Sequence, residues 1–197
     1  MVSATLAAPR LDTPQLAQRA RRLSLVLTDC DGVLTDGGVY YSERSEGLRR
    51  FSVRDGMGVE RLREAGIGTA IVTRERSRSV VRRGVKLRLP HLFLGVQDKA
   101  AHLATILRET GCSADALAYI GDDVNDLGIL GLVARRGLTA APADAMPEVL
   151  GTVHYRCGAR GGFGAFREFA EWILRLRDGA AAFPKPTPER GRHKEGV

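Results

Sequence analysis

The sequence predicts an α/β fold in which helices cover both faces of a parallel sheet. Between residues 25 and 176, short apolar runs rich in strand formers alternate with segments of helical spacing, a pattern typical of such sheets. Most of these runs end at a residue suited to phosphate or metal. Ligands of parallel sheets bind at the carboxyl ends of the strands, so these positions predict a site as well as a fold.

The length of 197 residues suits one domain with loose ends. We expect an N-terminal extension over residues 1–22 that ends in a short helix from Pro14 to Arg22. The globular domain should occupy residues 23–177. The tail over residues 178–197 carries three prolines among charged residues, so we expect it to be disordered.

Composition and charge exclude several classes of protein. No stretch approaches the ~18 consecutive apolar residues of a transmembrane helix, so we expect no membrane partner. The N-terminus lacks a basic start followed by an apolar run, and the three cysteines are scattered, which favours a cytoplasmic location. The net charge of +7 comes from dispersed arginines without an aromatic-basic motif. It favours an anionic substrate, with nucleic acid as the weaker alternative.

The strands are predicted from short, bounded apolar runs. They are Leu25–Thr28, Gly68–Thr73, Leu92–Leu94 and Leu117–Ile120, with further short strands near Leu138 and Val153. Between the first two strands, apolar residues around Tyr40 and Phe51 flank a polar stretch. This arrangement predicts a β-hairpin with an exposed tip.

Helices are expected between the strands. We expect Asp55 to cap a helix that runs to Ala65 and stops at Gly66. The remaining helices are predicted over Arg76–Arg83, Asp98–Thr110, Val124–Leu130 and Phe163–Leu176.

Charged and hydroxyl residues follow the strands at four places. Asp29 and Asp31 come directly after the first strand, where residues two apart share a side, so their carboxyl groups can converge. Two close carboxylates repel unless a cation or a shared proton lies between them. Thr73 ends the second strand, and Lys99 opens the helix after the third.

The fourth strand is followed by Gly121-Asp122-Asp123, with Asn125 and Asp126 close behind. Taken singly, each of these features could be a surface turn, a helix cap or a solvated charge. Four such features at successive strand ends point to a functional site instead.

These residues resemble the four motifs of the haloacid dehalogenase (HAD) phosphatase superfamily. The first motif, DxDGxx(T/V), is matched by residues 29–35, and the second, a Ser or Thr, by Thr73. The third, a lysine, is matched by Lys99, and the fourth, GDDxxD, by residues 121–126. The resemblance spans Leu25 to about Leu176 and implies a three-layer Rossmann-like fold.

The resemblance also implies a mechanism. Asp29 would attack phosphorus and form an aspartyl phosphate, while Asp31 would serve as general acid and base. Mg²⁺ would be held by Asp29, the main-chain carbonyl of Asp31 and Asp122. Thr73 and Lys99 would hold the phosphoryl oxygens. Three further residues would position these groups: Asp123, Asn125 and Asp126.

The chain between the motifs is too short for the cap domain that many members of the superfamily carry. Only a small β-hairpin insertion and one helix lie between Thr35 and Thr73. The sequence therefore resembles the capless tetrameric branch that acts on 3-deoxy-2-keto sugar acid phosphates. The matching segments are residues 29–37, residues 51–56 and Arg160-Gly161-Gly162. We expect a small anionic sugar phosphate as substrate and a homotetramer whose hairpins gather at its centre.

Two subgroups of this branch compete. Glu75 and Lys86 resemble the subgroup that acts on nine-carbon 9-phosphates, whereas Arg54 and its neighbours look more like the eight-carbon 8-phosphate subgroup. Arg74 fits neither pattern, and the charged residues at this place could simply be a solvated helix start. We favour the nine-carbon substrate, with the eight-carbon substrate as the alternative, and expect Glu75, Lys86, Arg54 and Arg160 to contact the substrate.

A non-catalytic interpretation is a tetramerisation domain like those appended to some acylneuraminate cytidylyltransferases. Loss of a motif residue would favour it. Asp29, Asp31, Lys99 and Asp122 are all present, which favours the enzyme.

Overall fold

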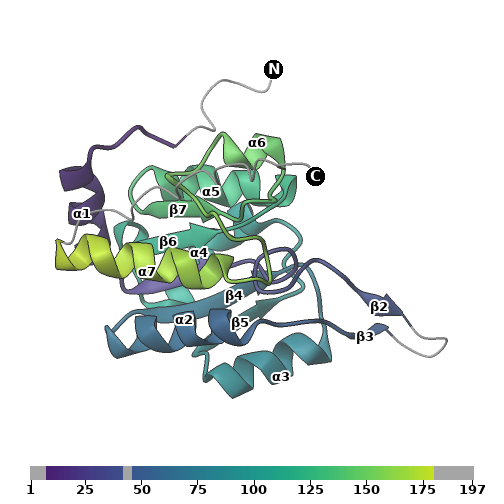
Figure 1. The fold of residues 1–197 in the computed structure, drawn as a ribbon. Helices are drawn as coiled ribbons and strands as arrows, with labels where there is room; N and C mark the ends of the chain where they lie inside the picture. Colours follow the sequence, from purple (N-terminus) through teal and green to yellow (C-terminus); the bar gives the residue numbers. More distant parts are fainter. Residues whose placement is uncertain (1–7, 42–45, 180–197) are drawn as a thin grey trace, which may run out of the picture.

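In the computed structural model, which describes residues 8–41 and 46–179, six parallel strands form a sheet between two layers of helices (Figure 1). The strands are β1 (Leu25–Thr28), β4 (Gly68–Thr73), β5 (His91–Leu94), β6 (Leu117–Ile120), β7 (Leu138–Ala141) and β8 (Tyr155–Arg156). Their order is β5-β4-β1-β6-β7-β8, so β1 lies between β4 and β6. The predicted α/β class with a parallel sheet is confirmed.

Each face of the sheet packs against its own helices. The first face is covered by α1 (Thr13–Arg22), α2 (Val53–Glu64), α3 (Arg78–Leu87) and α7 (Ala165–Asp178). The second face is covered by α4 (Lys99–Thr110), α5 (Leu127–Ala134) and α6 (Pro147–Leu150). Alternate side chains of β1 enter the two cores: Val26 packs in the first and Leu27 in the second.

The longest apolar runs were the easiest to predict. The bounds of β1, β4 and β6 agree with the predicted strands. The strand expected near Val153 begins instead at Tyr155, and α6 and the 3₁₀ helices η1 (Ala114–Ala116) and η2 (Val124–Asp126) were not expected as separate elements. These are pieces of two to four residues, too short to show a period.

The predicted hairpin is present as β2 (Tyr40–Tyr41) paired antiparallel with β3 (Glu46–Leu48). It projects from the carboxyl-end side of the sheet (Figure 1). Tyr41 is 76% exposed and Leu48 is 69% exposed, so the hairpin offers apolar surface to solvent in the single chain. The expected tip falls on residues 42–45, outside the described residues.

Asp55 does not cap its own helix, contrary to the sequence prediction. Ser52 is the N-cap of α2, where its hydroxyl accepts a hydrogen bond from the Arg54 amide. The buried carboxyl of Asp55 instead accepts hydrogen bonds from the amides of Gly164 and Arg167 at the start of α7. The cap is supplied by a residue more than a hundred positions earlier in the chain, which no local pattern reveals.

Helix α1 begins one residue before the predicted Pro14 and packs against α7. Its Arg19 donates to the carbonyls of Ala134 and Gly137, which ties it to the end of α5. The predicted tail lies almost wholly outside the described residues. Among the helices that the structure describes, none has the length and apolar character needed to cross a membrane.

Candidate active site

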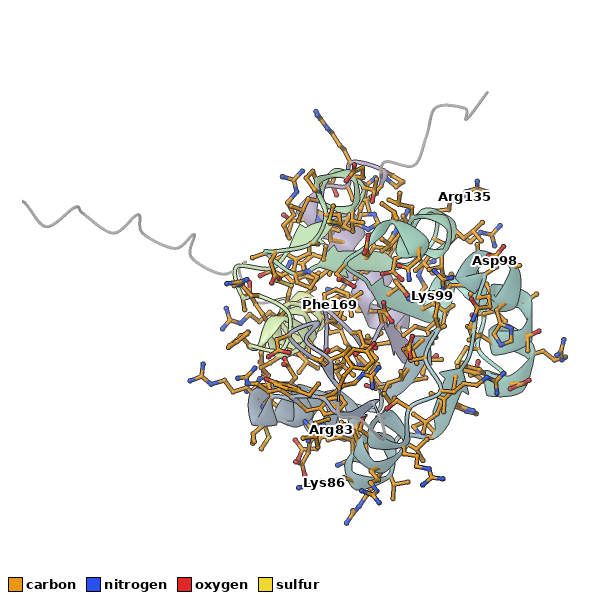
Figure 2. All side chains as sticks on the ribbon, turned by 90° about the vertical axis from the view of Figure 1, so that its right-hand side faces the viewer. Arg83, Lys86, Asp98, Lys99, Arg135 and Phe169 are labelled. Atoms are coloured by element: carbon orange, nitrogen blue, oxygen red, sulfur yellow. The ribbon has the colours of Figure 1, made fainter. Side chains whose placement is uncertain are left out.

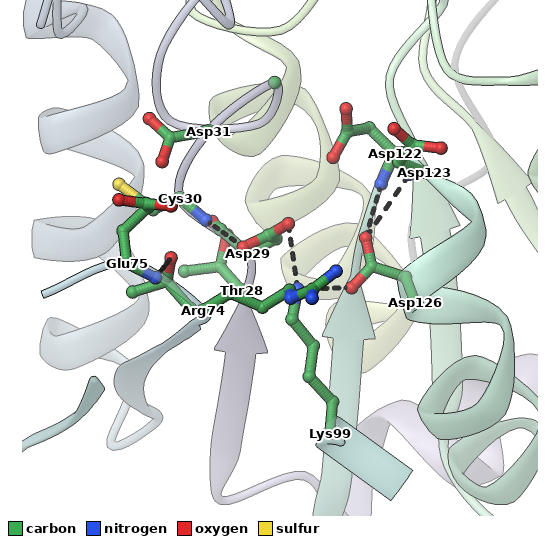
Figure 3. Close-up of polar contacts among 12 residues, drawn as sticks. Thr28, Asp29, Cys30, Asp31, Arg74, Glu75, Lys99, Asp122, Asp123 and Asp126 are labelled. Atoms are coloured by element: carbon green, nitrogen blue, oxygen red, sulfur yellow. Dashed lines mark hydrogen bonds and ion pairs between the residues drawn. The ribbon is translucent and has the colours of Figure 1, made fainter. Parts of the chain in front are cut away.

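The predicted catalytic aspartate lies at the centre of the sheet edge. Asp29 directly follows β1, and its amide donates to the carbonyl of Ile120 at the end of β6, 3.0 Å away. Its Oδ1 accepts a 2.7 Å hydrogen bond from the amide of Cys30, which fixes the carboxyl group (Figure 3). Only 8% of the side chain is exposed, so the group faces the site with little surrounding water.

Lys99 reaches the same point from the start of α4. Its ammonium group lies 2.8 Å from Oδ2 of Asp29 and 2.6 Å from Oδ1 of Asp126 (Figure 3). Burial alone would lower the pKa of Lys99, but the two carboxylates outweigh it and raise that pKa. The lysine is therefore held as a cation beside Asp29.

Asp126 is fully buried and uses both of its oxygens within the protein. Oδ1 accepts from Lys99 and from the hydroxyl of Tyr119, each at 2.6 Å. Oδ2 accepts from the amides of Asp122 and Asp123 at 3.0 and 3.4 Å. These bonds connect Asp126 to Lys99 and to the loop after β6, and the positioning role of Asp126 stays a prediction.

The carboxylates of Asp29, Asp122 and Asp126 offer oxygens that lie within 4.8 Å of one another. Asp126 lies beneath the small cavity with both oxygens bonded to protein donors, whereas Asp29 and Asp122 line that cavity, so Asp29 and Asp122 are the groups that fit a metal ion. Oδ1 of Asp122 is buried and has no hydrogen-bond partner among the described residues. Gly32 makes room for this carboxyl: a Cβ at that position would overlap Asp122, and the φ of +83° also favours glycine.

The charges of the cluster do not balance within the protein. Three carboxylates face one ammonium group, which leaves two negative charges. Burial and the neighbouring Asp126 accordingly raise the pKa of Asp29 to about 7, and burial with Asp29 raises the pKa of Asp122 to about 8. A divalent cation would restore the balance, and an oxygen-only donor set is what Mg²⁺ prefers. The residues present therefore fit the ion that the sequence predicts.

A cavity of about 180 Å³ opens above these groups. It is lined by Asp29, Asp31, Thr73, Arg74, Glu75, Asp122, Asp123 and Asn125. The structure thus gathers the predicted site residues from the ends of three strands around one small cavity, with Lys99 and Asp126 beneath it. Thr73 accepts a hydrogen bond from the amide of Glu75 at 3.1 Å, which orients its hydroxyl.

Arg49 is a site residue that the sequence analysis missed. It comes from the end of the hairpin, and its Nε lies 2.7 Å from Oδ1 of Asp31. Its side chain is only 1% exposed. The superfamily motifs do not include this position, and a charged residue next to a hairpin is ordinarily solvated, so only the three-dimensional structure reveals the pair.

A second, larger cavity of about 670 Å³ adjoins the hairpin and α3. Six basic side chains line it: Arg49, Arg76, Arg78, Arg82, Arg83 and Lys86. Among the described residues of its lining, Glu75 alone is acidic, and Glu75 also belongs to the small cavity. Figure 2 views the molecule from the side that carries the hairpin. In this view Arg83 and Lys86 lie close to each other, and Lys99 lies at a distance from both. Two predicted substrate contacts, Glu75 and Lys86, therefore line a basic cavity next to the candidate site.

The other two predicted substrate contacts lie elsewhere in the single chain. Arg54 is exposed on α2 and lines neither cavity. The side chain of Arg160 is 71% exposed and pairs with Asp144 at 3.1 Å. Neither residue lines the cavity around Asp29 or the larger basic cavity, so their predicted contacts with the substrate remain predictions.

Comparison with known proteins gives the family. No family model matches the sequence. The chain is 38% identical over 161 residues to the 3-deoxy-D-manno-octulosonate 8-phosphate phosphatase KdsC of Yersinia pestis, which covers 82% of this chain and 84% of that protein. It is 35% identical over 168 residues to KdsC of Haemophilus influenzae, covering 85% and 92% of the two chains.

Solved structures agree. The cobalt-bound phosphatase of H. influenzae matches with a TM-score of 0.77 at 35% identity, covering 82% of this chain and 92% of that one. The Moraxella catarrhalis enzyme, in complex with magnesium, phosphate and 3-deoxy-D-manno-octulosonate (KDO), matches with a TM-score of 0.78 at 30% identity, covering 85% and 95%. A Legionella pneumophila chain described as a HAD superfamily (subfamily III A) hydrolase matches with a TM-score of 0.78 at 35% identity, covering 84% and 90%. The chain therefore belongs to the KdsC family of phosphatases, within the haloacid dehalogenase superfamily.

Proposed function

We propose that this chain is a Mg²⁺-dependent phosphatase that hydrolyses a 2-keto-3-deoxy sugar acid phosphate, the eight-carbon 8-phosphate in particular. The observation that carries the proposal is the buried Asp29, held between Lys99 and the Cys30 amide at the mouth of a small polar cavity. A carboxylate fixed in this way can attack phosphorus without first reorganising.

The reaction would proceed in two steps. In the first, an oxygen of Asp29 forms a bond to phosphorus while the bond from phosphorus to the sugar oxygen breaks, and Asp31 gives its proton to that oxygen. In the second, water attacks phosphorus and gives a proton to Asp31 while the bond between phosphorus and the Asp29 oxygen breaks. This step releases phosphate and restores the carboxylate of Asp29. Asp31 lies two residues after Asp29 and lines the same cavity, as this exchange requires.

The other residues would bind and neutralise the phosphoryl group. The hydroxyl of Thr73 accepts a hydrogen bond from the amide of Glu75, so its own hydrogen is available to a phosphoryl oxygen. Lys99 offsets the charge of Asp29 and of the incoming phosphate. Bound Mg²⁺, held by Asp29, the Asp31 carbonyl and Asp122, would supply further neutralisation of the phosphoryl oxygens.

The choice of eight carbons rests on the relatives. The nine-carbon preference of the sequence analysis is not confirmed, and the alternative fits better, because the curated relatives are named as 3-deoxy-D-manno-octulosonate 8-phosphate phosphatases. One observation still favours nine carbons as a second candidate. Glu75 and Lys86, the residues that resemble the nine-carbon subgroup, both line the larger basic cavity.

The basic cavity supports an acidic sugar chain in either case. With the phosphoryl group in the small cavity, the sugar would extend past Glu75 into the larger one, where six cations outnumber one carboxylate. Such an excess of positive charge favours a ligand that carries a carboxylate as well as a phosphate. The cytoplasmic location and the domain boundaries at residues 22 and 177 remain predictions.

A phosphate-release assay with Mg²⁺ tests the substrate. We expect kcat/KM for the eight-carbon 8-phosphate to exceed that for a nine-carbon 9-phosphate by at least about tenfold, because about 1.4 kcal/mol of differential binding suffices for such a ratio. A reversed ratio that disappears in Glu75→Ala and Lys86→Ala would establish the second candidate instead. Absence of turnover on both would refute the sugar acid assignment.

Replacement of the nucleophile tests the mechanism. Asp29→Asn should lower kcat by at least about 10⁴-fold, because an amide oxygen is a poor nucleophile toward phosphorus. Circular dichroism should show an unchanged fold. The exposed Glu64→Gln on α2 is the control and should retain full activity. Appreciable turnover by Asp29→Asn would contradict the aspartyl phosphate route.

Metal removal tests the cofactor. Chelation should abolish activity and Mg²⁺ should restore it, and Mg²⁺ at about 100 times its Kd should stabilise the fold by about 2.7 kcal/mol. Asp122→Asn should lose most of this stabilisation in thermal unfolding, since it removes the carboxyl whose Oδ1 has no partner among the described residues. Full activity in excess chelator, or equal stabilisation of the variant, would argue against this site.

We also propose a homotetramer in which the hairpins gather and Arg160 meets the substrate of a neighbouring chain. Exposed Tyr40, Tyr41 and Leu48 support an interface at the hairpin. The exposed side chain of Arg160 is free to reach beyond its own protomer if it exchanges Asp144 for a substrate carboxylate, which a guanidinium binds in bidentate fashion.

Arg160→Glu should raise KM for the sugar acid phosphate at least about tenfold and leave KM for a small neutral phosphate ester nearly unchanged. Arg108→Glu on the exposed face of α4 is the matched charge reversal and should change neither value. Light scattering on the active protein should give four chains. An active monomer would overturn the assembly, and equal KM changes on both substrates would overturn the role of Arg160.

A further inference from the structure

We propose that Arg49 is a positioning residue: it fixes the carboxyl group of Asp31 so that one oxygen, Oδ2, is presented to the bond being cleaved. The inference rests on the proposed function, because it takes Asp31 as the group that exchanges a proton with the leaving oxygen and with water. It adds the residue that sets the direction of that exchange.

The two oxygens of Asp31 have different surroundings. Oδ1 lies 2.7 Å from Nε of Arg49 and accepts a 3.3 Å hydrogen bond from the hydroxyl of Thr35. Within the described part of the chain, no hydrogen bond reaches Oδ2. Because Asp31 lines the small cavity and its Oδ1 is engaged by Arg49 and Thr35, Oδ2 is the oxygen that we assign to the reacting group.

Arg49 is itself held from several sides. Nη1 donates to the hydroxyl of Ser77 at 2.9 Å, and Nη2 lies 3.6 Å from Oε2 of Glu75. Ser77 is the N-cap of α3, so the guanidinium connects the hairpin to the segment that follows β4. A planar donor group anchored at several nitrogens can fix the rotamer of its carboxylate partner, which a solvated lysine at the same place would do less well.

The position of Arg49 also matches the path of the substrate. Arg49 lines the large basic cavity, and its partner Asp31 lines the small one, so the pair lies where the two cavities meet. In the proposed binding mode, the phosphoryl group occupies the small cavity and the sugar the large one. The oxygen that joins them would then lie beside Asp31, at the point where a correctly aimed proton donor is needed.

The two reacting carboxylates thus have separate cations. Lys99 contacts Asp29 and Asp126, whereas Arg49 contacts Asp31 and Glu75. Removal of Arg49 should therefore affect the proton transfers of Asp31 and spare the nucleophilic attack by Asp29. This separation makes the proposal testable with leaving groups of different quality.

The experiment compares the wild type with Arg49→Met and Arg49→Lys on two substrates, the sugar acid phosphate and 4-nitrophenyl phosphate. Departure of the sugar alkoxide needs a proton, whereas 4-nitrophenolate leaves without one. For Arg49→Met we expect kcat on the sugar acid phosphate to fall about 100-fold. On 4-nitrophenyl phosphate we expect a rapid burst of about one nitrophenolate per site, followed by slow turnover, because hydrolysis of the aspartyl phosphate still needs Asp31.

Arg49→Lys keeps the charge and should recover part of the lost kcat, and it serves as the test if Arg49→Met does not fold. The control is Arg108→Met, a surface arginine on α4, which should behave as the wild type on both substrates. A fall of the first turnover by the same factor on both substrates, with no burst, would show that Arg49 acts on the fold or on binding instead. Unchanged kcat in both Arg49 variants would equally overturn the proposal. Absence of turnover by the wild type would overturn the proposed function itself.

Discussion

The site depends on the paired contact of the Lys99 ammonium group with the carboxylates of Asp29 and Asp126. The ammonium group is almost completely buried, and an unpaired charge in that environment would cost several kcal/mol, so its two carboxylate partners are fixed in place by necessity. One partner, Asp29, directly follows β1. The other, Asp126, accepts hydrogen bonds from the loop after β6 and from Tyr119. Through this one cation, the start of α4 and the ends of β1 and β6 are held at fixed separations.

The charge left over by this arrangement explains the rest of the chemistry. Three carboxylates around one lysine leave two negative charges, which disfavour a phosphate until a divalent cation compensates them. Gly32 lets the carboxyl of Asp122 approach the motif loop closely, within reach of the carboxyl of Asp29. Positive charge on the outer side, in the basic cavity, then favours the acidic part of the substrate. Under the proposed function, the negative half of the site would hold the metal and the positive half would hold the acidic substrate.

The sequence predicted the parts of this site that local patterns encode. The strands β1, β4 and β6 are continuous apolar runs, and the motif residues follow them directly, so the edge of the sheet and its carboxylates could be derived in advance. The missed features depend on distant segments. Arg49 meets Asp31 only because the hairpin folds back, and Asp55 caps a helix that begins more than a hundred residues later. The nine-carbon preference rested on two exposed residues, Glu75 and Lys86. The identity of two residues does not by itself determine the length of a substrate.

Under the proposed function, the hairpin would fill two roles that a cap domain fills in other enzymes. Its outer side chains, Tyr41 and Leu48 among them, offer apolar surface that a second chain can cover, which would limit access of water to the cavity. Its inner end places Arg49 against Asp31 within the same chain. Because Arg49 also contacts Glu75 and Ser77, a movement of the hairpin would be transmitted to both the proton donor and the segment that lines the basic cavity. If the proposed assembly and the proposed role of Asp31 both hold, closure by a neighbouring chain and alignment of the general acid would be connected through one short insertion.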